Sequence, residues 1–149
     1  MADEEKRLAL VALLDPYLDN SDCYEPTPLV PLELYFEGND DQGSIGCNLT
    51  KHPGVRSFYE TLLQLRNDGQ VSGIWVIAKQ HDWKPGWPHS DEILVRTTLS
   101  DSDIKSRLNH LGPDEVGEAS SSPPFELHDL AGLPVACAAG ERHVVAWWD

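Results

Sequence analysis

The sequence predicts an α+β fold of the ferredoxin-like split βαβ type, in which two helices pack on one face of an antiparallel sheet. The main reason is the order of hydrophobic patterns, which reads strand, helix, strand, strand, helix, strand after a separate N-terminal helix. A second reason is size, because 149 residues with 40% hydrophobic side chains can bury one core. We therefore expect residues 1–149 to form a single domain.

The first 28 residues are expected to form the additional helix and a polar loop. Leucines at helical spacing predict a helix over residues 3–14, and Pro16 ends it. The next segment, LVPLELYFEG, alternates between apolar and other side chains, which is typical of a half-buried strand. The side chains expected toward the core are Leu32, Leu34 and Phe36. Those expected toward solvent are Glu33, Tyr35 and Glu37.

Residues 29–111 are expected to form the core of the domain. Pro53 suits the first position of a helix over residues 53–66, because apolar side chains follow it at helical spacing. Two buried strands are predicted by VSGIWVIAK at residues 71–79 and by EILVRTT at residues 92–98.

The last third of the chain contains one more helix and one more strand. A capping pattern at Ser100 or Ser102 begins a helix that continues to Leu111. Residues 112–140 are rich in loop-forming residues. The segment HVVAWW, within residues 141–149, predicts the final strand.

The strongest overall signal is the net charge of −14. Residues 1–50 contain 11 acidic and two basic side chains, and residues 101–149 contain nine acidic and three basic ones. Such a field repels nucleic acid and anionic membrane surfaces, and it attracts basic proteins. The sequence therefore predicts a basic protein partner, no nucleic-acid partner and no membrane partner. Acidity that only maintains solubility is the alternative interpretation.

The N-terminus and the cysteines indicate the compartment. The segment MADEEKRLALVALL places acidic residues where a secretory signal needs positive charge. No apolar run reaches the 18 residues that a membrane-spanning helix needs. The three cysteines are irregularly spaced, which favours free thiols in a reducing compartment. These features predict a protein of the bacterial cytoplasm.

The segment EGNDDQGSIGCN, residues 37–48, is the first candidate site. Its glycine is misplaced for a calcium-binding EF-hand loop, and the acid that such a loop needs at its last position is absent. It also lacks the lysine of a phosphate-binding loop and the first glycine of a serine nucleophile elbow. Loops on a rigid sheet are common binding sites. The residues expected to form a binding surface here are Glu37, Asn39, Asp40 and Asp41.

A few residues of this segment could perform chemistry. Cys47 and His52 could pair, because an imidazole near a thiol favours the nucleophilic thiolate. Asp40 and Asp41 are candidates for an irregular Mg²⁺ or Ca²⁺ site, whereas the histidines and cysteines show no spacing typical of zinc sites. No metal and no cofactor are predicted. We expect the two aspartates to point outward and Cys47 to point inward.

The segment QHDWKPGWPHSDE, residues 80–92, is the second candidate site. It joins two expected strands and contains Trp83 and Trp87 among prolines, glycine and histidines. These indoles either cover one end of the core or form an exposed aromatic patch, which is favoured at protein interfaces. His89 and Asp91 could act as an acid–base pair.

Two stretches, LYFEGNDDQGSIGCNL and GWPHSDEILVRT, resemble signature segments of a family of small, acidic, uncharacterised bacterial proteins. The resemblance extends to LGPDEV and to the terminal AWWD, so it covers residues 30–149. It implies a bacterial protein, and it implies no particular activity.

Three functions are compatible with these patterns. The first is a non-enzymatic acidic protein-binding domain, for example an immunity-type neutraliser of a basic toxin. The second is a small hydrolase or metal-dependent enzyme, which requires the two candidate segments to meet in space. Its residues would be Asp40, Asp41, Cys47 and His52. The third is a homo-oligomeric regulatory protein such as a homodimer.

Overall fold

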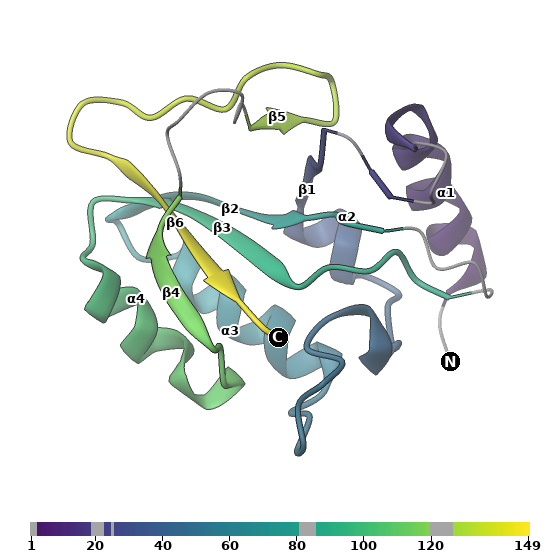
Figure 1. The fold of residues 1–149 in the computed structure, drawn as a ribbon, viewed down its shortest axis with the longest axis horizontal. Helices are drawn as coiled ribbons and strands as arrows, with labels where there is room; N and C mark the ends of the chain where they lie inside the picture. Colours follow the sequence, from purple (N-terminus) through teal and green to yellow (C-terminus); the bar gives the residue numbers. More distant parts are fainter. Residues whose placement is uncertain (1–2, 19–22, 25, 81–85, 120–126) are drawn as a thin grey trace.

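The computed structural model describes residues 3–18, 23–24, 26–80, 86–119 and 127–149. These residues form a six-stranded sheet with the strand order β4-β6-β3-β2-β1-β5. The helices α2, α3 and α4 lie on one face of the sheet, whereas the chain around β5 lies on the other side (Figure 1). The helix α1 lies on the side of β1 and α2, away from α4 (Figure 1).

The elements follow the expected order with some additions. The strands are β1 Pro28–Pro31, β2 Val71–Ile77, β3 Glu92–Thr97, β4 Glu115–Glu118, β5 His128–Asp129 and β6 Arg142–Trp147. The helices are α1 Glu4–Leu14, α2 Leu32–Phe36, α3 Val55–Arg66 and α4 Asp101–Leu108, with 3-10 turns at Asp15–Tyr17, Gln42–Ser44 and Asn109–Leu111. The helices expected over residues 3–14, 53–66 and 100–111 are therefore confirmed, as are the three later strands. The expected loop-rich segment contains β4 and β5 in addition.

The segment predicted as a strand around Tyr35 is a helix, so that prediction is wrong. The strand β1 ends at Pro31, and α2 begins at the next residue. Leu32, Tyr35 and Phe36 are the buried residues of α2, which is the i, i+3, i+4 spacing of a helix. Over so few residues, alternation and helical spacing both fit the apolar positions, and Pro31 ends the sheet pairing because proline cannot donate to it. Tyr35 is therefore fully buried instead of facing solvent.

The α+β class is confirmed, but the ferredoxin-like split βαβ arrangement is not. In that arrangement, a single helix connects two parallel strands. Here β1 pairs antiparallel with β2, β2 with β3, and β3 with β6. The chain passes through both α2 and α3 between β1 and β2, so it returns in the opposite direction. The pairing of β1 with β5 is parallel, which makes the sheet mixed.

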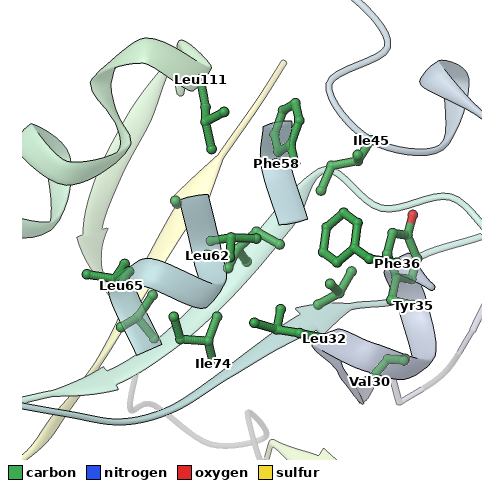
Figure 2. Packing of buried hydrophobic residues seen from close by; sticks show 14 of the residues in the cluster. Val30, Leu32, Tyr35, Phe36, Ile45, Phe58, Leu62, Leu65, Ile74 and Leu111 are labelled. Carbon is green, nitrogen blue, oxygen red and sulfur yellow. The ribbon is translucent and has the colours of Figure 1, made fainter. Parts of the chain in front are cut away.

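Each face of the sheet packs against a different part of the chain. The face toward the helices contributes Val76, Ile93 and Val95 to the main core. Figure 2 shows Leu32 and Phe36 of this core together with residues of α3 such as Phe58 and Leu62. Each such side chain stabilises the fold by about 1.5–3 kcal/mol when it is buried.

The opposite face of the sheet buries a smaller cluster. Its members are Leu29, Ile77 and Leu94, and partly buried side chains pack against them from Ala119, Leu127 and Val135. The segment predicted to be loop-rich therefore covers one side of the sheet.

Gly73 allows a tryptophan to lie flat against the strand β2. A Cβ atom at Gly73 would be 2.3 Å from the Trp75 ring, which is far inside van der Waals contact. The Arg96 guanidinium lies 5.1 Å from the centre of the same ring, and it also donates to the Ser72 hydroxyl at 2.9 Å. The absence of a side chain at Gly73 therefore leaves space for the Trp75 ring, against which Arg96 lies.

We expect Gly73→Ala to lower the free energy of unfolding by about 1–3 kcal/mol, because the added methyl group displaces the Trp75 ring and its cation–π contact. Urea denaturation followed by circular dichroism measures this change. Gly117→Ala is the matched control, since no atom lies within 4 Å of a Cβ at that strand position. Equal stability of the two variants would contradict the prediction.

Candidate binding surface

The two candidate segments meet in space. Residues 37–48, here called the acidic loop, lie against residues 86–91, here called the tryptophan loop. Ile45 and Ser90 form a parallel β-bridge, and the Ser90 N–H donates to the Ser44 carbonyl at 2.8 Å. The predicted fold did not require this contact, which joins two stretches that the sequence places about 45 residues apart. We call the two loops together the joint surface.

Asp41 is the main polar connection within the joint surface. Its Oδ1 accepts from the Gly43 N–H at 2.9 Å, and its Oδ2 accepts from the Trp87 N–H at 3.1 Å. Its own N–H donates to Asn39 Oδ1 at 2.9 Å. Both carboxylate oxygens therefore bind backbone within the protein. The prediction that Asp41 points outward is wrong, whereas Asp40 is exposed as expected.

Tyr35 contacts both loops from the side of the core. Its hydroxyl lies 2.8 Å from the Ser44 carbonyl oxygen and 2.7 Å from the Pro88 carbonyl oxygen, and its single O–H is shared between these two acceptors. The side chain is fully buried, and this burial raises the pKa of Tyr35 far above its ordinary value. The hydroxyl therefore remains a neutral donor at any physiological pH.

Asn39 fills the interior of the acidic loop. Its Nδ2 donates to the Ser44 hydroxyl at 3.0 Å, and both side chains are buried. The Asn39 N–H donates to the Phe36 carbonyl, which ties the start of the loop to the end of α2. Asn39 was predicted to bind a partner, but it holds the loop in shape instead.

The first turn of α1 contacts both loops. The Asp3 N–H donates to the Gly38 carbonyl at 2.8 Å, and the Arg7 guanidinium donates to the Gly86 carbonyl at 3.4 Å. Gly38 has a φ of 81°, and a Cβ there would be 2.8 Å from the Asp3 Cβ. Glycine is therefore required at this position. The joint surface and the beginning of α1 form one continuous region of the protein.

The proposed cysteine–histidine pair is absent from the structure. Cys47 is exposed, so the prediction that it points inward is wrong, and the neighbouring Gly46 is buried instead. The Nε2–H of His52 donates to the Ile45 carbonyl at 2.7 Å, and its Nδ1 accepts from the Gly54 N–H at 2.9 Å. Both ring nitrogens of His52 are thus used to shape the chain before α3, and neither can activate a thiol.

His89 and Asp91 also have separate environments. The His89 Nδ1–H donates to the Gly43 carbonyl at 3.2 Å, so the imidazole supports the joint surface. Asp91 has one buried carboxylate oxygen without a hydrogen-bond partner among the described residues. No hydrogen bond within the described part of the chain joins the side chains of Asp91 and His89. An acid–base pair is therefore not formed. The described residues likewise contain no group of three or more histidine, cysteine, aspartate or glutamate side chains arranged to hold a metal ion.

The tryptophans mainly fill the core. Trp87 is only 1% exposed, so the prediction that it forms an exposed patch is wrong and the structural interpretation holds. Its indole Nε1–H has no hydrogen-bond partner within the described part of the chain. Trp148 is equally buried, and its Nε1–H donates to the Leu111 carbonyl at 2.9 Å. Trp83 lies outside the described residues.

Glu37 is the predicted binding residue that most clearly faces solvent. Its side chain is 52% exposed, and its only close cation is the Lys6 ammonium at 3.9 Å among the residues that are described. An exposed ion pair at this distance contributes little to stability, so the carboxylate remains accessible to a partner. Glu37 and Asp40 are thus the acidic side chains that the joint surface presents.

A protein-family model described as "Uncharacterized protein YfbO family" matches residues 5–139. The chain belongs to the YfbO family. It is 32% identical over 145 residues to the "Uncharacterized protein YfbO" of Escherichia coli (strain K12), and the match covers 97% of each chain. Family membership confirms the resemblance to a group of uncharacterised bacterial proteins. No solved structure matches the chain.

Sequence reasoning missed the roles of two residues in this YfbO-family protein. For Tyr35, the strand that the alternating pattern predicts would place the side chain in solvent. Its position three residues after Leu32 and directly before Phe36 would have indicated a buried helical face. For Gly38, the signal was its place next to Asn39, since a glycine–asparagine pair is typical of a turn with positive φ. None of the helices in the described ranges has the length and apolar character needed to cross a bilayer.

We expect Tyr35→Phe to lower the free energy of unfolding by about 1–3 kcal/mol, because the buried Pro88 carbonyl loses the Tyr35 donor and the Ser44 carbonyl keeps only the Ser90 N–H. Tyr59→Phe is the matched control. Its hydroxyl makes only an exposed 3.4 Å contact with Glu37, and the stacking of its ring on Phe36 is kept, so we expect a change below about 0.5 kcal/mol. Urea denaturation of both variants measures these changes. A larger loss of stability in Tyr59→Phe than in Tyr35→Phe would contradict the prediction.

Asp41→Ala removes the acceptors of the Gly43 and Trp87 N–H groups, so we expect a stability loss of about 1–3 kcal/mol. Hydrogen exchange should also accelerate at the Trp87 amide, where the local effect is direct. Gln42→Ala tests the neighbouring exposed position of the same turn and should leave both quantities unchanged. Unchanged exchange at Trp87 in Asp41→Ala would show that this carboxylate does not hold the loops together.

Proposed function

We propose that the protein is a non-enzymatic, acidic protein-binding domain of the bacterial cytoplasm that neutralises a basic protein, as immunity proteins do. The observation that carries the proposal is the construction of the joint surface. Asp41 and His52, which catalysis would need, are bound to the protein's own backbone. Glu37 and Asp40 remain exposed to meet a partner.

The charge of the chain supports the same function. A net charge of −14 on 149 residues produces a negative field that accelerates encounter with a cationic protein. The field is screened at high ionic strength, so binding of this kind depends on salt. Pre-organised loops add to the affinity, because little conformational entropy is lost when they bind.

The enzyme hypothesis meets one of its conditions, because the two candidate loops do come together. The enzyme hypothesis also requires a nucleophile next to a free base, and this requirement is less well supported. Cys47 is exposed on the surface, and its expected base, His52, has both ring nitrogens in hydrogen bonds with backbone. An activated thiolate needs a base within reach. We therefore favour binding over hydrolysis.

A homodimer formed through the free edge of the sheet is also less well supported. Glu115 and Glu118 lie at the two ends of the edge strand β4, and both are exposed. Antiparallel pairing of two such strands would place the glutamates of one copy opposite those of the other, and like charges directly opposite each other are destabilising.

Affinity capture from a lysate of the source bacterium tests the proposed function. We expect the immobilised protein to retain a basic protein at about 0.05 M salt and to release most of it at about 0.5 M salt. Glu37→Gln/Asp40→Asn should reduce retention several-fold. Glu115→Gln/Glu118→Gln is the matched control, because it removes the same charge from a different face.

Two results would contradict the proposal. One is the absence of any basic protein at either salt concentration. The other is an equal loss of retention in the two double variants, which would indicate attraction by net charge alone. Thermal melting of each variant confirms that it is folded before the comparison is made.

A further inference from the structure

The helix α1 is apolar on two sides, although only one side is buried in the protein. Leu10 and Leu14 are fully buried in the main core. On the opposite side, Leu8 is 53% exposed and Leu13 is 46% exposed. Ala9 and Ala12 are exposed as well, so the four residues form a continuous stripe along the helix. Large apolar side chains exposed in this way along one helix face are typical of an interaction site.

A hollow beside this stripe continues the apolar surface toward α2. It has a volume of about 290 Å³, and its lining comprises Lys6, Ala9, Glu33, Leu34 and Glu37. The apolar side chains Ala9 and Leu34 are accompanied by two carboxylates, Glu33 and Glu37, and by the Lys6 ammonium, which lies 3.9 Å from Glu37. Leu34 is half-buried and packs against the main core, so this part of the hollow is well supported.

The charges around the stripe are mainly negative. Residues 3–15 contain four acidic side chains, Asp3, Glu4, Glu5 and Asp15, against two basic ones, Lys6 and Arg7, and Arg7 is paired with Glu4. The hydrogen-bonded ion pair of Glu33 with Arg66 lowers the pKa of that carboxyl, so Glu33 is ionised at neutral pH and Arg66 offsets part of its charge. An apolar stripe between carboxylates is complementary to a helix that has an apolar face and basic flanks.

The same charges disfavour a second copy of this chain as the occupant. Antiparallel packing of two α1 helices would place Glu4 and Glu5 of one copy near Asp15 of the other. Lys6 and Arg7 offset this repulsion only in part, because Arg7 is already paired with Glu4 and Lys6 with Glu37. Each copy also carries a net charge of −14. A basic partner avoids both sources of repulsion.

We propose that the exposed face of α1, together with the hollow between α1 and α2, binds a basic amphipathic helix of the partner protein. This inference rests on the proposed binding function and specifies the chemistry of the partner. Glu37 belongs both to the hollow and to the joint surface, and the first turn of α1 is hydrogen-bonded to Gly38. A helix on α1 would therefore place the rest of its protein next to Asp40.

A synthetic helical peptide with leucines at i, i+3, i+4 and i+7 and lysines elsewhere is the probe. We expect it to bind the full chain in a fluorescence anisotropy titration at low salt. A peptide of the same composition in scrambled order, and one with glutamates in place of the lysines, should each bind about tenfold more weakly or less. The scrambled peptide separates recognition of the amphipathic helix from attraction by charge.

Leu8→Ser/Leu13→Ser is the variant that removes the stripe. We expect it to bind the amphipathic peptide about tenfold more weakly, which corresponds to about 1.4 kcal/mol. Leu133→Ser is the matched control, because Leu133 is 61% exposed on a different part of the surface, and its affinity should equal that of the unaltered protein. Circular dichroism verifies that the helix content of both variants is unchanged.

The outcomes distinguish this inference from the proposed function. Equal binding of the ordered and scrambled peptides, or undiminished binding by Leu8→Ser/Leu13→Ser, would overturn the inference. Undiminished capture of a basic protein by Leu8→Ser/Leu13→Ser in the lysate experiment would also overturn the inference. The proposed function would stand in that case. Light scattering that shows a dimer for the unaltered protein and a monomer for Leu8→Ser/Leu13→Ser would identify a second copy as the occupant and overturn the basic partner.

Discussion

The hydroxyl of Tyr35 lies between two backbone carbonyls that belong to different loops, and the shape of the candidate surface depends on this contact. A hydroxyl transferred from water to the protein interior loses several kcal/mol unless it finds an acceptor. Ser44 and Pro88 provide two, at 2.8 and 2.7 Å. The requirement couples the loops to α2, because neither loop can move away without exposing or orphaning a polar group in the core.

The other contacts of the joint surface add to this constraint. Asp41 and His52 accept or donate hydrogen bonds that would otherwise be missing from turns without regular secondary structure. Asn39 does the same inside the acidic loop. Side chains whose types suggest catalysis in the sequence thus provide hydrogen bonds that the backbone itself provides in a strand or helix. The consequence for function is a surface with fixed geometry and few groups left to react.

The sequence predicted the elements whose signal spans many residues. The helix α3 and the strands β2 and β3 begin and end within about two residues of the predicted bounds, because their apolar patterns continue over six or more residues between clear turn signals. The five residues of α2 are too few for that, and Pro31 decided between helix and strand. The contact of Ile45 with Ser90 could not be predicted, because no local pattern encodes a pairing between loops so far apart in sequence. Whether Asp41 and Cys47 point inward or outward depends on that contact, so the sequence could not predict their directions either.

The pairing of Ile45 with Ser90 lies directly beyond the open end of the antiparallel β2–β3 pair, where Gln80 already bridges His89. This placement has a consequence for the order of folding. Closing a chain segment of about 45 residues is entropically slow, but the β2–β3 pair brings the ends together first and shortens the remaining search. We expect the joint surface to assemble after the sheet and to open before it. Partial unfolding would then remove recognition while leaving most of the architecture in place.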